Sequence, residues 1–143
     1  VKELFPRRKL KPELVLETPD DDLRGAGMSR NKVAAFQDLS AKTLDGTVPT
    51  MAKLKRMSDD EIIERLVQVR GIGQWTVEML LMFRLGRPDV MPVTDLGVRK
   101  GYMVLEGLPD LPKPKELREC TEHWKPWRSV ACWYLWRIAD QQP

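Results

Sequence analysis

Glycine and proline residues cut this sequence into short blocks, and that division constrains the fold more than any other feature. Almost every block between the breaks repeats its apolar residues with the period of a helix rather than the alternation of a strand. No block has the pattern of a good strand. The sequence therefore predicts an all-α fold, and 143 residues with 42% apolar residues are enough for one hydrophobic core.

Capping residues place the first expected helices. After a basic opening interrupted by proline, Thr18 is expected to cap a short helix that ends near Gly25. Aspartates follow Thr18 in the first turn, where the helix dipole favours acidic side chains. Ser29 is expected to cap a second helix, which runs to about Leu44.

A capping box predicts the start of the next helix. Ser58 is followed three residues later by Glu61, so each side chain can accept from a backbone N–H at the other position. Apolar residues are expected to bury one face of this helix: Ile62, Ile63, Leu66 and Val67. The helix is expected to stop at a turn at residues 70–73. The following helix, over about residues 75–85, is apolar nearly all round, which predicts a central helix packed on several sides.

Prolines dominate the chain after this helix. They predict a loop at about residues 86–96, in which Thr94 or Asp95 is expected to cap the next helix. A modest helix at about residues 116–123 and a last helix at about residues 127–140 are expected to complete the bundle.

Composition narrows the class of protein. The 24 Lys and Arg against 21 Asp and Glu give a net charge of +3, which permits a polyanionic partner without requiring one. No apolar stretch is long enough for a membrane span, and the first residues lack the apolar core of a signal peptide, so we expect a soluble intracellular protein. Cys120 and Cys132 are expected to be reduced thiols, and His123, as the single histidine, does not provide a usual Cys/His zinc site.

The turn Val69-Arg70-Gly71-Ile72-Gly73 is the first candidate site. Two glycines in a tight turn before a helix leave backbone amides uncovered, and these amides with the helix dipole can bind an anion such as a DNA phosphate. Ile72 is expected to pack the turn onto the core. The competing interpretation is an ordinary turn between helices, which a bare Gly-x-Gly does not exclude.

Asp95 is the second candidate, and the tryptophans are a separate third one. A carboxylate at a helix N-terminus is most often a cap, but Pro92 makes the approach to Asp95 rigid, as a catalytic carboxylate requires. Of five tryptophans, Trp133 and Trp136 lie one turn apart on one helix. Most tryptophans are expected in the core, and a minority in a pocket for a planar cation or base. Several basic residues are candidates for phosphate contacts, among them Arg99, Lys125 and Arg128.

Three motifs together carry a resemblance to a known family. They are Leu-x-x-Val-x-Gly-Ile-Gly-Gln-Trp-Thr at residues 66–76, Asp-Val-Met-Pro-Val-Thr-Asp-Leu-Gly-Val-Arg-Lys at residues 89–100, and Trp-Lys-Pro-Trp-Arg-Ser at residues 124–129. In this order they resemble the helix-hairpin-helix superfamily of base-excision DNA glycosylases, and within it the 3-methyladenine DNA glycosylase II branch. The resemblance implies a helical bundle of that type, with the hairpin at about residues 58–85.

The resemblance also implies roles for individual residues. Asp95 falls on the family's catalytic aspartate, whose carboxylate stabilises the sugar cation formed as the N-glycosidic bond breaks. Trp75 stands where bifunctional members carry a Schiff-base lysine, so a monofunctional enzyme without lyase activity is expected. Trp75, Met79 and Trp136 fall on positions that line the pocket for a flipped, alkylated purine. The implied DNA-binding residues lie on the hairpin: Arg70, Gly71, Ile72, Gly73, Gln74 and Thr76.

The implied partner is double-stranded DNA with a flipped damaged base, and the implied reaction requires no cofactor. Backbone carbonyls at Val67, Val69 and Ile72 match those that hold a structural Na+ or K+ ion in relatives. Family members carry further helices before this region, so we expect one domain over residues 1–143 that is truncated at its N-terminus. Association into an oligomer is one way to complete such a core. The expected compartment is the bacterial cytoplasm and nucleoid or the eukaryotic nucleus.

Other functions are open at this point. A non-enzymatic helix-hairpin-helix module would hold only the DNA backbone, so Gly71 and Gly73 would matter and Asp95 would not. A helical interaction domain without a nucleic-acid role would also suit the modest charge. Within the enzyme class, excision of uracil or mismatched thymine is an alternative to excision of alkylated purines.

Overall fold

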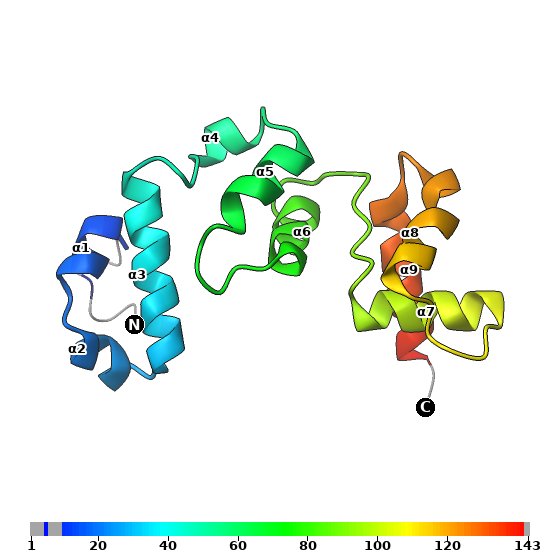
Figure 1. The fold of residues 1–143 in the computed structure, drawn as a ribbon, viewed down its shortest axis with the longest axis horizontal. Coiled ribbons are helices and arrows are strands. Elements are labelled where there is room, and N and C mark those ends of the chain that lie inside the picture. Colours follow the sequence, from blue (N-terminus) through cyan, green and yellow to red (C-terminus); the bar gives the residue numbers. More distant parts are fainter. Residues whose placement is uncertain (1–4, 6–9, 142–143) are drawn as a thin grey trace. The chain divides into compact units, whose positions relative to one another are not determined.

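The computed structural model describes residue 5 and residues 10–141, and every regular element along them is helical (Figure 1). The expected all-α class is therefore confirmed, while most of the basic opening segment lies outside the described residues. The chain divides into two compact units, Val1–Val77 (unit 1) and Glu78–Pro143 (unit 2). The helices are α1 Pro12–Glu17, α2 Asp20–Gly25, α3 Arg30–Leu44, α4 Met51–Leu54, α5 Asp59–Leu66, α6 Gln74–Phe83, α7 Leu96–Glu106, α8 Pro114–Cys120, the 3-10 helix η3 Glu122–Trp124, and α9 Arg128–Asp140.

In unit 1, α1 and α2 pack against the long helix α3 (Figure 1). Their common core consists of the buried side chains of Phe5, Val15, Leu23 and Val33. Ser29 caps α3, because its hydroxyl accepts from the backbone N–H of Lys32 at 3.4 Å. This cap and the end of α3 at Leu44 confirm the expected bounds.

The expected cap at Thr18 is wrong. Thr18 follows α1, a helix that the sequence did not predict and that has Pro12 in its first turn. Its hydroxyl donates back to the carbonyl of Leu14 at 2.6 Å, which is a bond typical of a helix end. Pro19 is the residue before α2. A threonine between two short helices suits the end of one as well as the start of the other.

The capping box at α5 is confirmed. The Ser58 hydroxyl accepts from the N–H of Glu61 at 3.3 Å, and the Glu61 carboxylate accepts from the N–H of Ser58 at 2.8 Å. Ile62 and Leu66 are buried as expected, but Val67 is exposed, because α5 ends at Leu66 and the chain turns away there. The short helix α4 before it was not predicted.

Helix α6 is less enclosed than its apolar sequence suggested. Val77, Leu81 and Met82 are buried, but Trp75 and Phe83 near its two ends are 47% and 55% exposed. The helix is therefore not packed on all sides, and the boundary between the two units falls within it.

Unit 2 is built on the packing of α7 against α9. At Gly101 the two helices approach so closely that a Cβ there would lie 2.0 Å from the backbone oxygen of Leu135. The last helix occupies the expected range almost to the residue, whereas α8 ends at Cys120 and η3 continues to Trp124. Among the described residues, no helix has the length and apolar character that a membrane crossing requires.

Candidate functional site

Asp95 lies at the N-terminus of α7, where one of its oxygens is held from two sides. Its Oδ1 accepts from the backbone N–H of Val98 at 2.8 Å, which makes Asp95, rather than Thr94, the cap. The same Oδ1 accepts from the indole Nε1–H of Trp136 on α9, also at 2.8 Å. The structure therefore joins two residues to which the family resemblance gave roles in one active site, and it fixes the orientation of the carboxylate.

Gly97 makes this approach of the indole feasible. A Cβ on Gly97 would lie 2.8 Å from Cδ1 of Trp136 and 3.2 Å from Oδ1 of Asp95. Any larger side chain would meet the indole ring at the point where it bonds to the carboxylate. The first turn of α7 thus needs a glycine for reasons of space.

The loop before Asp95 is part of the core of unit 2. Val90, Met91, Pro92 and Val93 are all buried, and the N–H of Asp95 donates to the carbonyl of Pro92 at 2.9 Å. A buried, proline-containing approach has few alternative conformations. The carboxylate is consequently carried by a rigid segment.

An aromatic trio, defined by Phe83, Trp133 and Trp136, adjoins the carboxylate. Phe83 stacks on Trp136 with ring centroids 5.9 Å apart and an interplanar angle of 16°. Trp133 meets Phe83 and Trp136 edge to face, at 5.4 and 5.9 Å. The spacing of the two tryptophans was visible in the sequence, but Phe83 was missed because its partners lie on α9, far along the chain.

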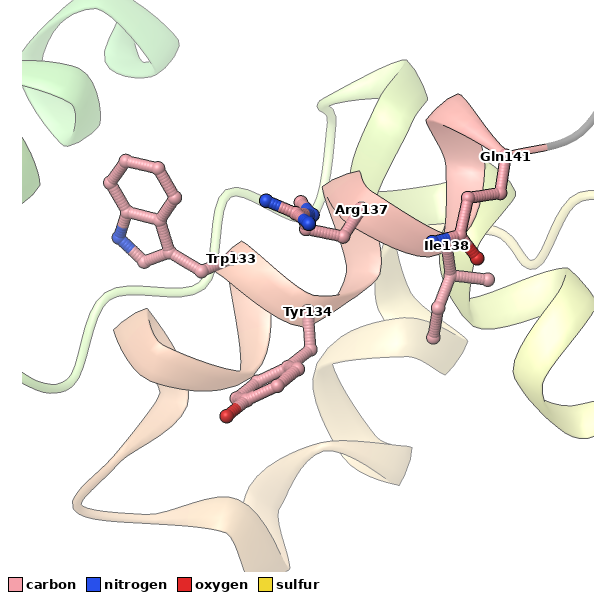
Figure 2. Close-up of a pocket in the computed structure, with 5 residues that line it drawn as sticks. All are labelled: Trp133, Tyr134, Arg137, Ile138 and Gln141. Carbon is pink, nitrogen blue, oxygen red and sulfur yellow. The ribbon is translucent and has the colours of Figure 1, made fainter.

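The outer face of α9 carries a hollow of about 420 Å³ beside this trio (Figure 2). Figure 2 shows Trp133, Tyr134 and Arg137 projecting from the helix around it. Neither Asp95 nor Trp136 is among its lining residues. The hollow therefore lies next to the Asp95–Trp136 pair and does not include it.

Trp75 and Met79 are one turn apart on α6 and so share a face of that helix. Trp75 belongs to unit 1 and Met79 to unit 2. Their joining to Asp95 and Trp136 in one pocket stays a prediction.

The hairpin between α5 and α6 has a turn built around Gly71. This residue has φ of +79°, a left-handed conformation that favours glycine, and a Cβ there would lie 3.3 Å from the Cβ of Ala35. The N–H of Arg70 donates to the carboxylate of Asp38 on α3 at 2.7 Å, which anchors the turn. Among the described residues, the N–H groups of Gly71 and Gly73 donate to no other backbone group. Gln74 and Thr76 follow in the exposed first turn of α6.

The carboxylate of Asp38 lies beside this turn, and its two partners keep it negatively charged. The backbone N–H of Arg70 and the ammonium of Lys42 lower the pKa of Asp38 below its ordinary value. Lys42 also forms an ion pair with Asp38, which offsets the charge that an anion at the turn would meet. The anchoring carboxylate and an anion site are therefore compatible.

The carbonyls expected to hold a monovalent cation lie around the end of α5. Val67 is the C-cap residue directly after α5, at the end of the helix where the dipole favours a cation. The carbonyl of Val69 accepts from the N–H of Ile72 at 3.0 Å, which uses one of the two lone pairs of that oxygen. Carbonyl oxygens are ligands of the kind that Na+ and K+ take, and an ion at these three stays a prediction.

Three of the basic residues considered for phosphate contacts have partners within unit 2. Arg128 forms an ion pair with Asp89, with Nε to Oδ1 at 2.6 Å. Lys125 pairs with Glu122 at 2.6 Å, and Nε of Arg99 donates to the carbonyl of Pro112 at 2.9 Å. Of the three, Arg128 matters most for the site, because its partner Asp89 lies in the loop that leads to Asp95.

Comparison with known proteins places these features in a family. The sequence profile of the HhH-GPD superfamily base excision DNA repair proteins matches residues 1–126. DNA-3-methyladenine glycosylase 1 of Schizosaccharomyces pombe is 41% identical over 128 residues, which are 90% of this chain and 56% of that protein. The chain thus spans little more than half the length of this relative.

Solved structures agree in fold. The Schizosaccharomyces pombe 3-methyladenine DNA glycosylase Mag1, in complex with abasic DNA, matches with a TM-score of 0.82 and 39% identity, over 95% of this chain and 66% of that one. DNA-3-methyladenine glycosidase of Bacillus halodurans matches with a TM-score of 0.87 and 34% identity, over 98% and 64% of the two chains. The expected helix-hairpin-helix glycosylase fold is confirmed, and the chain belongs to the HhH-GPD superfamily of base excision DNA repair proteins.

Proposed function

We propose that this chain carries the catalytic part of a monofunctional DNA glycosylase that excises alkylated purines, such as 3-methyladenine and 7-methylguanine. The observation that supports it best is the carboxylate of Asp95, held at Oδ1 by the Trp136 indole and the Val98 amide. The names of the relatives, which are 3-methyladenine glycosylases, support the same substrate class.

The reaction replaces the base with water. The bond from the anomeric carbon to the purine nitrogen breaks with its electron pair on the base, water oxygen bonds to that carbon, and a water proton is released. Positive charge develops on the sugar in the transition state, so a fixed carboxylate beside the sugar stabilises that state more than the ground state, in which the sugar is uncharged. Asp95 is assigned this role because residues 90–93 of its loop are buried and its side chain is held from two sides.

The substrate pocket is assigned to Trp75, Met79 and Trp136. Alkylation makes a purine electron-poor, so the electron-rich face of an indole attracts it without base-specific hydrogen bonds. Trp133 and Phe83 support Trp136 through ring contacts. Trp75 has no amine that could form a Schiff base with the sugar, so strand cleavage by that route is not expected.

Double-stranded DNA is assigned to the hairpin. The amides of Gly71 and Gly73, at the start of α6, would bind a backbone phosphate, with Arg70, Gln74 and Thr76 beside them. A Na+ or K+ ion held by carbonyls of Val67, Val69 and Ile72 would add positive charge between hairpin and phosphate. These contacts would be with the DNA backbone and would not depend on base sequence, which suits an enzyme that must act on damage anywhere in the DNA.

The test is base release from methylated duplex DNA by this chain, scored by chromatography of free bases and by alkali cleavage of abasic sites. The proposal expects release of 3-methyladenine and 7-methylguanine that Asp95→Asn abolishes and the exposed control Asp110→Asn does not. Release from uracil-containing DNA instead would change the substrate class. Salt-dependent DNA binding without any release would favour the non-enzymatic module.

A further inference from the structure

Ser129, in the first turn of α9, forms three hydrogen bonds with the backbone of the loop that leads to Asp95. Its hydroxyl donates to the carbonyl of Arg87 at 2.7 Å and accepts from the N–H of Val90 at 2.9 Å. Its own N–H donates to the carbonyl of Pro88 at 2.9 Å. Ser129 is only 7% exposed, so water competes little for these bonds. One residue therefore fixes the path of residues 87–90.

Arg128, the preceding residue, holds the same stretch of loop by its side chain. Its Nε and Nη2 donate to the two carboxylate oxygens of Asp89 at 2.6 and 2.9 Å, which is the parallel two-bond geometry of a strong ion pair. The hydrogen bond from Arg128 lowers the pKa of Asp89, so the pair is charged at neutral pH. The Asp89 carboxylate also accepts from the backbone N–H of Arg128 at 3.4 Å.

The same face of α9 continues to the catalytic carboxylate. Ser129, Cys132 and Trp136 follow one another at helical steps of three and four, so they line one face. Cys132 Sγ lies 3.5 Å from the carbonyl of Val90, and Trp136 donates to Asp95. Helix α9 thus holds the loop at its start, its middle and its end.

We propose that the Arg128–Asp89 pair and Ser129 act as a positioning clamp that sets where Asp95 meets Trp136. They are positioning residues, because their side chains are bonded to the loop: Arg128 to the carboxylate of Asp89, and Ser129 to the backbone of Arg87 and Val90. Between the clamp and Asp95, Val90, Met91, Pro92 and Val93 are buried, so a displacement at residues 87–90 has little room to be absorbed before it reaches the carboxylate. The catalytic consequence rests on the proposed function, whereas the structural consequence does not.

The structural consequence is tested through the indole N–H of Trp136, followed by NMR in this chain. Trp136→Phe assigns the signal, because it removes one indole resonance. Ser129→Ala is expected to speed solvent exchange of this proton on the order of tenfold, about the effect of one net hydrogen bond. The matched control is Ser40→Ala on α3, a buried serine whose hydroxyl donates to the carbonyl of Phe36 at 2.9 Å, and it should leave the Trp136 signal unchanged.

Asp89→Asn provides a second variant that preserves shape and removes charge. It should shift the Trp136 signal in the same direction as Ser129→Ala, and Arg128→Lys, which keeps the charge without the fork, should have a smaller effect. If circular dichroism shows that Ser129→Ala does not fold, the Trp136 signal of Asp89→Asn tests the clamp instead. An unchanged Trp136 signal in every folded clamp variant overturns the proposal.

The catalytic consequence is tested by single-turnover excision from methylated duplex DNA. Displacing a catalytic group by about 1 Å can cost on the order of a hundredfold in rate. Clamp variants should therefore lose roughly tenfold to a hundredfold in the rate constant while keeping the Kd for DNA. A merely destabilised protein would lose rate and binding together and would recover both on cooling. If the unaltered chain releases no base, the proposed function fails. The Trp136 signal then still tests whether Arg128, Asp89 and Ser129 position Asp95.

Discussion

Gly101 lies where α7 touches the backbone of α9, so Gly101→Ala tests the packing on which the Asp95 site depends. The added Cβ would lie 2.0 Å from the oxygen, 2.6 Å from the carbon and 2.8 Å from the Cα of Leu135. These are backbone atoms of a helix, which cannot rotate away as a flexible side chain does. The two helices must separate by about 1.4 Å to bring the oxygen to an ordinary contact at 3.4 Å.

The magnitude follows from this clash. Overpacking of a core costs about 1–3 kcal/mol, and a clash with backbone belongs at the upper end, about 3 kcal/mol. For a unit of this size each kcal/mol shifts Tm by about 4–8 °C, so Gly101→Ala should lower Tm by roughly 12–24 °C. The matched control is Gly25→Ala at the end of α2, where a Cβ meets nothing within 4 Å. Removing a glycine there should leave stability unchanged or raise it by about 0.4–1 kcal/mol.

Thermal unfolding followed by tryptophan fluorescence measures the change in Tm of unit 2, which contains Gly101. Every tryptophan except Trp75 lies in unit 2, so the signal reports mainly on the packing of α7 and α9. Equal melting temperatures for Gly101→Ala and Gly25→Ala would refute the close approach of the two helices.

Further predictions concern the hairpin and the thiols. Gly71→Ala should weaken DNA binding measured by fluorescence anisotropy, because the left-handed φ costs an alanine about 1–2 kcal/mol and its Cβ presses on Ala35. Asp38 has a lowered pKa when folded, so it stabilises the protein above the unfolded value of about 3.9 and loses that contribution as pH falls through the lower folded value. The urea midpoint of the unaltered chain should therefore exceed that of Asp38→Asn at pH 7 and converge with it in acid; equal midpoints at pH 7 would contradict this. Burial raises the pKa of Cys132 to about 12, so a thiol reagent at pH 8 should modify the exposed Cys120 alone until the chain is unfolded; two rapidly reacting thiols in the folded chain would be inconsistent with that burial.

Local signals in the sequence predicted the helix starts best. Ser29, Ser58 and Asp95 cap helices as expected, because donor and acceptor lie within three residues of each other. Helices α1 and α4 were missed because they have six and four residues, too few to show a periodic pattern. Thr18 was misassigned because a threonine hydroxyl can accept a hydrogen bond at the start of a helix or donate one at its end.

Contacts between distant residues could not be predicted from spacing. Asp95 was assigned through the resemblance, but its bond to Trp136 joins residues 41 apart. Arg128 was considered for phosphate contact, and its pairing with Asp89, 39 residues away, follows only from the packing of the loop on α9. Phe83 was treated as part of an enclosed helix for the same reason, because nothing near it in sequence reveals its stacking partner.

Asp95 is the centre of the proposed mechanism, and Asp95→Asn tests it with little structural disturbance. Asparagine is as good an N-cap as aspartate, and its amide oxygen can still accept from Val98 and from the Trp136 indole. The substitution therefore removes the negative charge and retains the fold.

The measurement is the single-turnover rate constant for 7-methylguanine release from duplex DNA, beside the Kd for the same DNA. The proposed mechanism predicts that Asp95→Asn lowers the rate constant by on the order of a hundredfold or more, as loss of one transition-state contact does, with Kd unchanged. A variant that releases the base at the rate of the unaltered chain would contradict the assignment of Asp95 as the catalytic carboxylate.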